Sequence, residues 1–152
     1  MSMHTQGREF EVQVRSNSST AEEWKRAMEA PLSELPPLDE EQKEMAKRFG
    51  IAEEEYARGE LARIYGQQGL RERGARLGSI VQRIVSSRDT SYRVTAVLYE
   101  GLKSRWIVQV EAPSGMRSVS IPRELADDVI DYELSESLQQ LKQRLTEAVT
   151  EQ

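Results

Sequence analysis

The sequence predicts an α+β fold in which several helices pack on one face of a small antiparallel sheet. Two observations lead to this prediction. Apolar residues recur at helical spacing over residues 20–87 and 122–149, and they alternate with polar residues over residues 92–121. A length of 152 residues fits one domain with a single core. We therefore expect one domain over residues 8–152, preceded by a disordered tail over residues 1–7.

The alternating segments predict the strands. Apolar residues occupy every second position over residues 92–98 and 106–110, and Val119 and Ile121 continue the pattern. Glycine-containing turns separate these segments, which is typical of an antiparallel meander of three strands. An earlier alternating segment over residues 10–14 predicts a further strand that can join the sheet as a fourth.

Capping residues mark the first helices. Thr20 precedes Glu23 by three residues, and Asp39 precedes Gln42 in the same way. In each pair the first side chain can accept from the backbone of the second residue, whose own side chain reaches back to the cap. Gly50 stands where a left-handed residue ends the second helix.

The following helices are less regular. A helix from about residue 52 is expected to be interrupted at Gly66 and Gly69, because glycine weakens a helix interior, and we interpret this stretch as a loop or hinge. A further helix is predicted over residues 70–86, followed beyond the sheet by a short helix over residues 122–131 and a final one to residue 149.

Two patterns are candidates for a helix interface. Leucines recur at spacings of four and three along the final helix, and this stripe can either dock on its own sheet or pair with another chain. Gly74 and Gly78 are four residues apart, which would let another backbone approach closely. The candidate interface residues are Leu134, Leu138, Leu141, Leu145, Gly74 and Gly78.

Residues 58–88 are the most distinctive segment. They hold seven arginines, no lysine and only two acids, so the segment carries about +5 in a chain whose net charge is −5. Segregated charge of this kind indicates either an anionic partner or an internal match to acidic segments, such as residues 53–55 or Asp127, Asp128 and Asp131. The candidate anion-binding or partner-binding residues are Arg71, Arg73, Arg76 and Arg83.

Two more specific sites are disfavoured. Residues 45–51 have the spacing of a helix-turn-helix, but the helix that would enter the DNA groove begins with three glutamates, which phosphates repel. Aspartates at positions 127, 128 and 131 could hold magnesium only if a second carboxylate cluster faced them, and the sequence offers no comparable motif. We therefore expect no metal at this position and interpret it as an acidic helix surface.

Composition disfavours most enzyme classes. The chain has no cysteine, and its one histidine, His4, lies in the expected tail. Thiolate chemistry is thereby excluded, and a zinc site or histidine-based triad is not expected. No apolar run reaches the roughly 18–20 residues of a membrane span, and the N-terminus lacks the apolar block of a signal peptide. We expect a cytoplasmic, non-catalytic protein without a cofactor or a membrane partner.

The resulting hypothesis is an adaptor or structural subunit that self-associates or joins a larger complex through helix faces. Sixteen arginines against five lysines are typical of a GC-rich bacterial genome. The alternative function is nucleic-acid binding through phosphate contacts from residues 58–88, without base recognition.

Overall fold

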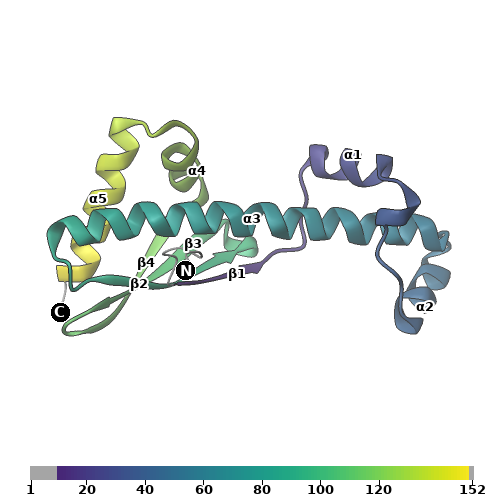
Figure 1. Cartoon of the computed structure of the whole chain (residues 1–152), viewed down its shortest axis with the longest axis horizontal. Helices are drawn as coiled ribbons and strands as arrows, with labels where there is room; N and C mark the ends of the chain where they lie inside the picture. Colours follow the sequence, from purple (N-terminus) through teal and green to yellow (C-terminus); the bar gives the residue numbers. More distant parts are fainter. Residues whose placement is uncertain (1–9, 151–152) are drawn as a thin grey trace, which may run out of the picture. The chain divides into compact units, whose positions relative to one another are not determined.

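The computed structural model describes residues 10–150, so the expected tail over residues 1–7 lies outside the described residues. The chain forms two compact units within the span that the sequence predicted as one domain (Figure 1). Unit 1 comprises residues 10–16 and 70–150, and unit 2 comprises Asn17–Gly69. Helix α3, Glu53–Arg88, supplies its first half to unit 2 and its second half to unit 1.

Unit 1 is built on a four-stranded sheet with the order β1-β2-β3-β4. Its strands are β1 (Glu11–Arg15), β2 (Arg93–Glu100), β3 (Arg105–Ala112) and β4 (Gly115–Pro122), and the short 3-10 helix η2 (Gly101–Lys103) joins β2 to β3. Strands β2, β3 and β4 pair antiparallel, whereas β1 pairs parallel with β2. The predicted α+β class and the meander are confirmed, and the N-terminal strand is the fourth member of the sheet.

Three helical segments cover one face of this sheet. They are the second half of α3, α4 (Arg123–Tyr132) and α5 (Ser135–Thr150). The sheet residues that face them include Tyr99, Trp106 and Ile121, which lie in one row across β2, β3 and β4. The rings of Tyr99 and Trp106 pack with their centroids 4.8 Å apart. Unit 1 therefore has a core of large apolar and aromatic side chains.

Unit 2 consists of α1 (Ala21–Glu29), the short 3-10 helix η1 (Leu32–Glu34), α2 (Glu40–Phe49) and the first half of α3. Both predicted capping boxes are present, at the starts of α1 and α2. Gly50 ends α2 with a φ of +71°, and the N–H of Ile51 donates to the carbonyl oxygen of Ala46. This is the left-handed cap that the sequence predicted.

Helix α3 runs without interruption through Gly66 and Gly69, so the prediction of a loop there is wrong. A Cβ atom at Gly66 would lie 2.6 Å from the carbonyl oxygen of Ser18, and one at Gly69 would lie 3.1 Å from a carboxylate oxygen of Glu23. These glycines let the segment before and within α1 approach the helix closely. They serve packing, and they do not break the helix.

Among residues 10–150, no helix is both long enough and apolar enough to cross a bilayer.

Candidate functional site

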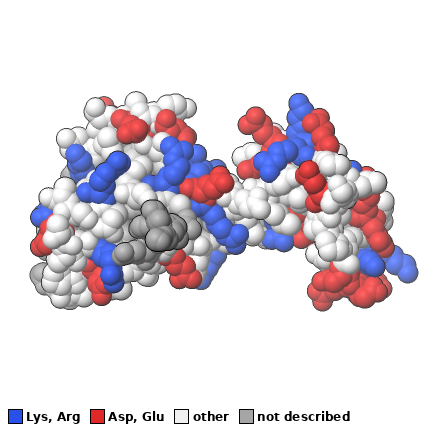
Figure 2. Space-filling model, viewed as in Figure 1, with Lys and Arg blue, Asp and Glu red and all other residues white. Residues whose placement is uncertain are grey.

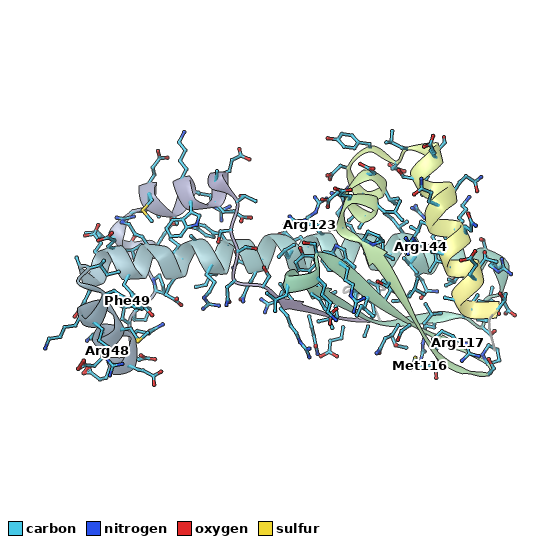
Figure 3. The ribbon with its side chains drawn as sticks, turned by 180° about the vertical axis from the view of Figure 1, so that it is seen from behind. Arg48, Phe49, Met116, Arg117, Arg123 and Arg144 are labelled. Atoms are coloured by element: carbon cyan, nitrogen blue, oxygen red, sulfur yellow. The ribbon has the colours of Figure 1, made fainter. Side chains whose placement is uncertain are left out.

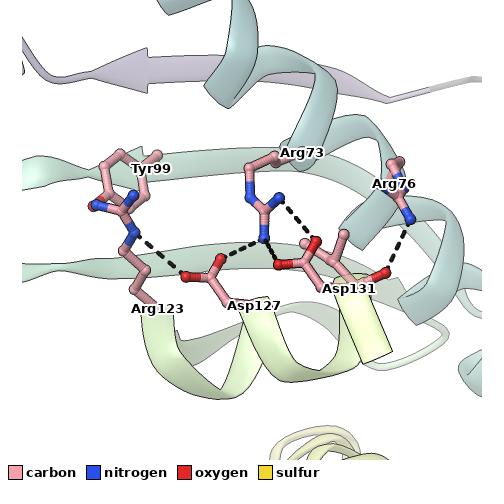
Figure 4. A network of polar contacts seen from close by, with 7 residues as sticks. Arg73, Arg76, Tyr99, Arg123, Asp127 and Asp131 are labelled. Atoms are coloured by element: carbon pink, nitrogen blue, oxygen red, sulfur yellow. Dashed lines mark hydrogen bonds and ion pairs between the residues drawn. The ribbon is translucent and has the colours of Figure 1, made fainter. Parts of the chain in front are cut away.

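Arg73, one of the four predicted site residues, is paired inside unit 1. It extends from α3 toward α4, where its Nη2 lies 2.6 Å from Oδ1 of Asp127 and 3.0 Å from Oδ2 of Asp131, while its Nη1 lies 3.1 Å from the other oxygen of Asp131 (Figure 4). The hydrogen bonds from Arg73 lower the pKa of Asp131, and those bonds in turn raise the pKa of Arg73. Of the two alternatives for the arginines, the structure therefore shows the internal one for Arg73, which pairs with acidic residues of α4 in its own unit.

The same network reaches the sheet through Arg123. Its Nε lies 3.6 Å from Asp127, and its Nη1 donates to the hydroxyl of Tyr99 at 3.0 Å. Asp127 thus lies between two guanidinium groups, which neutralise the acidic surface expected on α4. Within residues 10–150 there is no group of three or more histidine, cysteine or carboxylate side chains that could hold a metal ion.

The other arginines in this half of α3 form no ion pair with a carboxylate among the described residues. Arg71, Arg76, Arg83 and Arg88 are exposed, and none of them forms an ion pair within residues 10–150. Arg76 donates to the carbonyl oxygen of Ile130 at 2.9 Å, and Arg88 donates to the hydroxyl of Thr146 at 2.9 Å. Four exposed positive charges are therefore left on α3.

Two of these arginines flank a shallow groove of about 470 Å³ between α3 and α4. Arg76 and Arg83 are seven residues apart, hence on one face of the helix. Ala75 and Ile80 give the groove an apolar wall, and Ser79, Glu133 and the almost fully buried Ile130 complete its lining. We call this surface the arginine groove. It combines an apolar lining with a positive rim.

The leucine stripe of the C-terminal helix is largely internal to unit 1. Leu141 and Leu145 are fully buried, and Leu138 is half-buried against the same core. Leu134 is exposed and precedes the first residue of α5. Of the two alternatives for this stripe, the structure shows docking on its own unit, so Leu141 and Leu145 are not available to another chain while unit 1 is folded.

Gly74 and Gly78 also face their own unit. A Cβ atom at Gly74 would lie 2.7 Å from Val12 and 2.9 Å from Trp106, and one at Gly78 would collide with the ring of Phe10. The space above these glycines is filled by side chains of the sheet and of the residue before β1, so neither glycine is open to another helix.

Unit 2 has a different kind of core. Its core cluster consists of Ala27, Ala30, Leu61 and Ala62, and Leu61 is the only large apolar side chain that is buried within residues 17–69, all of which the structure describes. Trp24 and Met28 share α1 with the buried Ala27, but neither is buried. The exposed fractions are 46% for Trp24, 40% for Met28, 67% for Leu32 and 63% for Phe49.

Polar contacts hold α1 on α3. Nη1 of Arg58 donates to the carbonyl oxygens of Ala27 and Ala30, at 2.9 and 2.8 Å, and so caps the end of α1. Glu54 pairs with the same guanidinium at 3.1 Å, and the hydroxyl of Ser19 donates to the carbonyl oxygen of Ala62 at 2.8 Å. These bonds position α1 without burying its large apolar side chains.

Unit 2 also carries the net charge of the protein. Residues 17–69 contain seven lysines and arginines and twelve acids, which gives −5, the charge of the whole chain, so the charges of the remaining residues sum to zero. Acidic side chains gather over α2 in Figure 2. Four exposed glutamates at α2 and at the start of α3 form no ion pair within residues 10–150, and we call them the acidic face: Glu41, Glu44, Glu53 and Glu55.

No protein-family model, no curated protein and no solved structure matches this chain.

Proposed function

We propose that this protein is a non-catalytic, cytoplasmic interaction subunit whose unit 2 binds a partner protein. The observation that carries this proposal is the exposure of Trp24, Met28, Leu32 and Phe49 on a unit that buries only one large apolar side chain. Tryptophan and methionine are enriched at protein interfaces, and tryptophan is among the residues that dominate binding energy.

Three of these side chains lie in α1 and in the residues that follow it, and we call Trp24, Met28 and Leu32 the stripe. Trp24 and Met28 are four residues apart and so lie on one side of α1, whereas Leu32 begins η1, after the chain has become extended at Ala30 and Pro31. Covering side chains of this kind releases about 1.5–3 kcal/mol each relative to exposure, before the cost of association. A partner with an apolar groove fits this stripe.

Contacts with α3 hold α1 and the stripe in place, although the core beneath α1 is small. An aromatic carbon of Trp24 lies 3.7 Å from the position that a Cβ atom at Gly59 would take, so the indole rests on α3. The guanidinium of Arg26 lies over the ring of Tyr65, 3.5 Å from its centroid. Contacts of this kind orient α1 before a partner arrives, which lowers the entropic cost of binding.

Affinity capture with the tagged full-length chain tests the proposal. Replacing Trp24 and Met28 by alanine should reduce the amount of co-purifying protein about tenfold or more, because a central tryptophan of an interface typically contributes 2 kcal/mol or more. The matched control replaces Leu102 and Met116, which are exposed in unit 1, by alanine; Met116 lies at the turn between β3 and β4 (Figure 3). This control should bind as the wild type does.

Two results would contradict the proposal. One is equal loss of the bound protein in the Trp24/Met28 variant and in the control. The other is a wild-type chain that retains only nucleic acid, seen as absorbance at 260 nm that disappears at high salt. That result would favour the alternative function, phosphate binding by the arginines of α3.

A further inference from the structure

The acidic face of unit 2 and the arginine groove of unit 1 are opposite in charge, and neither is neutralised by ion pairs inside its own unit. Arg73 forms ion pairs with Asp127 and Asp131 of α4, whereas Arg76 and Arg83 of unit 1 form no ion pair within residues 10–150. On unit 2, Glu44 is left over in the same way. Both surfaces are therefore exposed with a net charge of opposite sign, and the same chain carries both.

Each surface also has an apolar part. Phe49, 63% exposed, ends α2 beside Arg48, on the helix that carries Glu41 and Glu44 (Figure 3). The arginine groove has an apolar wall at the partly buried Ile80. Lys47 and Arg48 precede the ring in the last turn of α2, but residues 40–55 as a whole contain six acids and three basic residues. An exposed aromatic ring on a surface of net negative charge and a groove with a basic rim are therefore complementary in both respects.

We propose that a second copy of this chain occupies the arginine groove, with Phe49 of one copy inserted between Arg76 and Arg83 of the other and the acidic face against the guanidinium groups. This inference rests on the proposed function, because it takes unit 2 as the binding unit. It adds a second surface to the stripe of Trp24, Met28 and Leu32 and names its occupant.

Charge sets the orientation of this contact. Bringing unit 2 of one copy against unit 2 of another would place −5 against −5, and bringing two arginine grooves together would place guanidinium groups against one another. Only the unlike pairing places opposite charges together, and like-charge contacts disfavour the other arrangements.

Each of the two surfaces also contains charges of the opposite sign, which oppose this pairing. Lys43 and Lys47 lie with Glu44 and Glu53 in a groove of about 490 Å³ between α2 and α3, and Lys43 lies 3.9 Å from Glu40. Glu133 lies in the arginine groove. Since the acids outnumber the basic residues on α2 and the start of α3, and the arginines outnumber the acid in the groove, each surface keeps its sign.

Because the contact joins two different surfaces of the chain, it can produce either a closed dimer or a head-to-tail assembly. A two-fold axis would make the contact twice in a dimer, and a head-to-tail arrangement would continue into a ring or a filament. The mass in solution distinguishes a dimer from a larger series.

Sedimentation velocity of the full chain over a range of concentrations tests the inference. The wild type should self-associate, and association should weaken as salt rises because exposed charges are screened. Phe49→Ala should weaken association about tenfold or more, as the loss of an aromatic anchor does. Reversing Arg76 and Arg83 to glutamate should weaken it to a similar extent, whereas the control Lys103→Glu with Lys142→Glu changes the net charge equally and should have no effect.

Mixing two variants gives the decisive result. A chain with Arg76→Glu and Arg83→Glu keeps its acidic face, and a chain with Glu44→Lys and Glu53→Lys keeps its arginine groove. Each alone should be impaired, and an equimolar mixture should associate again, because both pairs of surfaces regain opposite charge. Circular dichroism should first show that all variants are folded.

The inference fails if the wild type is monomeric at the highest attainable concentration, if the variants associate as the wild type does, or if the mixture stays dissociated. Wild-type protein whose arginines retain nucleic acid would also overturn it. Capture of a different protein that depends on Trp24 and Met28, by a chain that stays monomeric, would leave the proposed function intact and refute only the second copy. A wild-type chain that neither self-associates nor captures a partner through Trp24 and Met28 would refute both proposals.

Discussion

The two units differ in what they bury. Unit 1 covers Tyr99, Trp106, Leu77 and other large side chains completely, whereas unit 2 covers mainly alanines and leaves its tryptophan at the surface. Burial of large apolar side chains is the dominant stabilising contribution to folding. Unit 1 therefore gains most from apolar burial, whereas unit 2 leaves most of its large apolar side chains at least partly exposed.

Helix α3 shows this difference within one element. In unit 1 its buried positions are Leu70, Leu77, Val81 and Val85, and in unit 2 they are Ala57, Leu61 and Ala62. The same backbone thus supports two ways of packing, one through side-chain volume and one through close approach with polar bonds. Three experiments can break or sharpen this comparison.

The largest effect is expected from truncating the core of unit 1. Leu141→Ala should lower the free energy of unfolding by about 2–5 kcal/mol, because the side chain is fully buried and leaves a cavity. Urea denaturation measures this loss. Leu61→Ala should instead act locally in unit 2, so amide hydrogen exchange should rise within residues 17–69 while β2, β3 and β4 keep their protection. Equal loss of protection in the sheet would show that the two units unfold as one.

Glycines of α3 should respond with opposite signs in the two units. Gly74→Ala should destabilise by about 1–3 kcal/mol, because its Cβ would overlap Val12 and the rigidly buried Trp106. Gly59→Ala places its Cβ at an ordinary 3.7 Å from Trp24 and should stabilise by up to about 1 kcal/mol through helix propensity. Thermal denaturation of both variants checks the signs, and stabilisation by Gly74→Ala would contradict the close packing of unit 1.

The smallest effect is expected from the ion pair between Arg73 of α3 and Asp131 of α4, which is lost at acidic pH. Hydrogen bonds from Arg73 lower the pKa of Asp131, so this ion pair contributes stability above the ordinary aspartate pKa of about 3.9 and loses it as the pH falls through the lowered value. Asp131→Asn should cost at most about 1 kcal/mol at pH 7, because the side chain is 36% exposed and solvent screens the pair.

The pH dependence separates this effect from a general loss of packing. The difference between wild type and Asp131→Asn should shrink below about pH 4 and vanish once the wild-type carboxylate is protonated. Asp128→Asn, a neighbouring aspartate outside the network, is the control. A deficit for Asp131→Asn that is independent of pH would rule out the ion pair as its source.

Local signals in the sequence predicted much of the fold. The alternation over residues 92–121 predicted the meander, and the capping pairs at Thr20 and Asp39 and the glycine at position 50 predicted where α1 and α2 begin or end. These features depend on neighbouring residues only. The continuity of α3 was missed because the reason for Gly66 and Gly69 lies in Ser18 and Glu23, far along the chain.

The candidate site shows the same division. The sequence identified the arginines of residues 71–83 and listed Asp127 and Asp131 among their alternatives, but it could not select Arg73 as the paired one, because the choice depends on how α4 lies against α3. The exposure of Trp24 and Met28 likewise depends on α3, because α1 packs on its alanines and glycines, such as Ala62 and Gly59, and large side chains find little room to be buried there.

The parallel pairing of β1 with β2 has a consequence for synthesis of the chain. Glu11 pairs with Ala96, so β1 leaves the ribosome long before its partner strand exists, and all of unit 2 is made between them. Pairings this distant in sequence form late, because the intervening chain must first be ordered. The hairpins of β2, β3 and β4 are local by comparison. During translation the N-terminal segment therefore stays accessible to chaperones and proteases until residue 100 has emerged, and its docking completes the sheet.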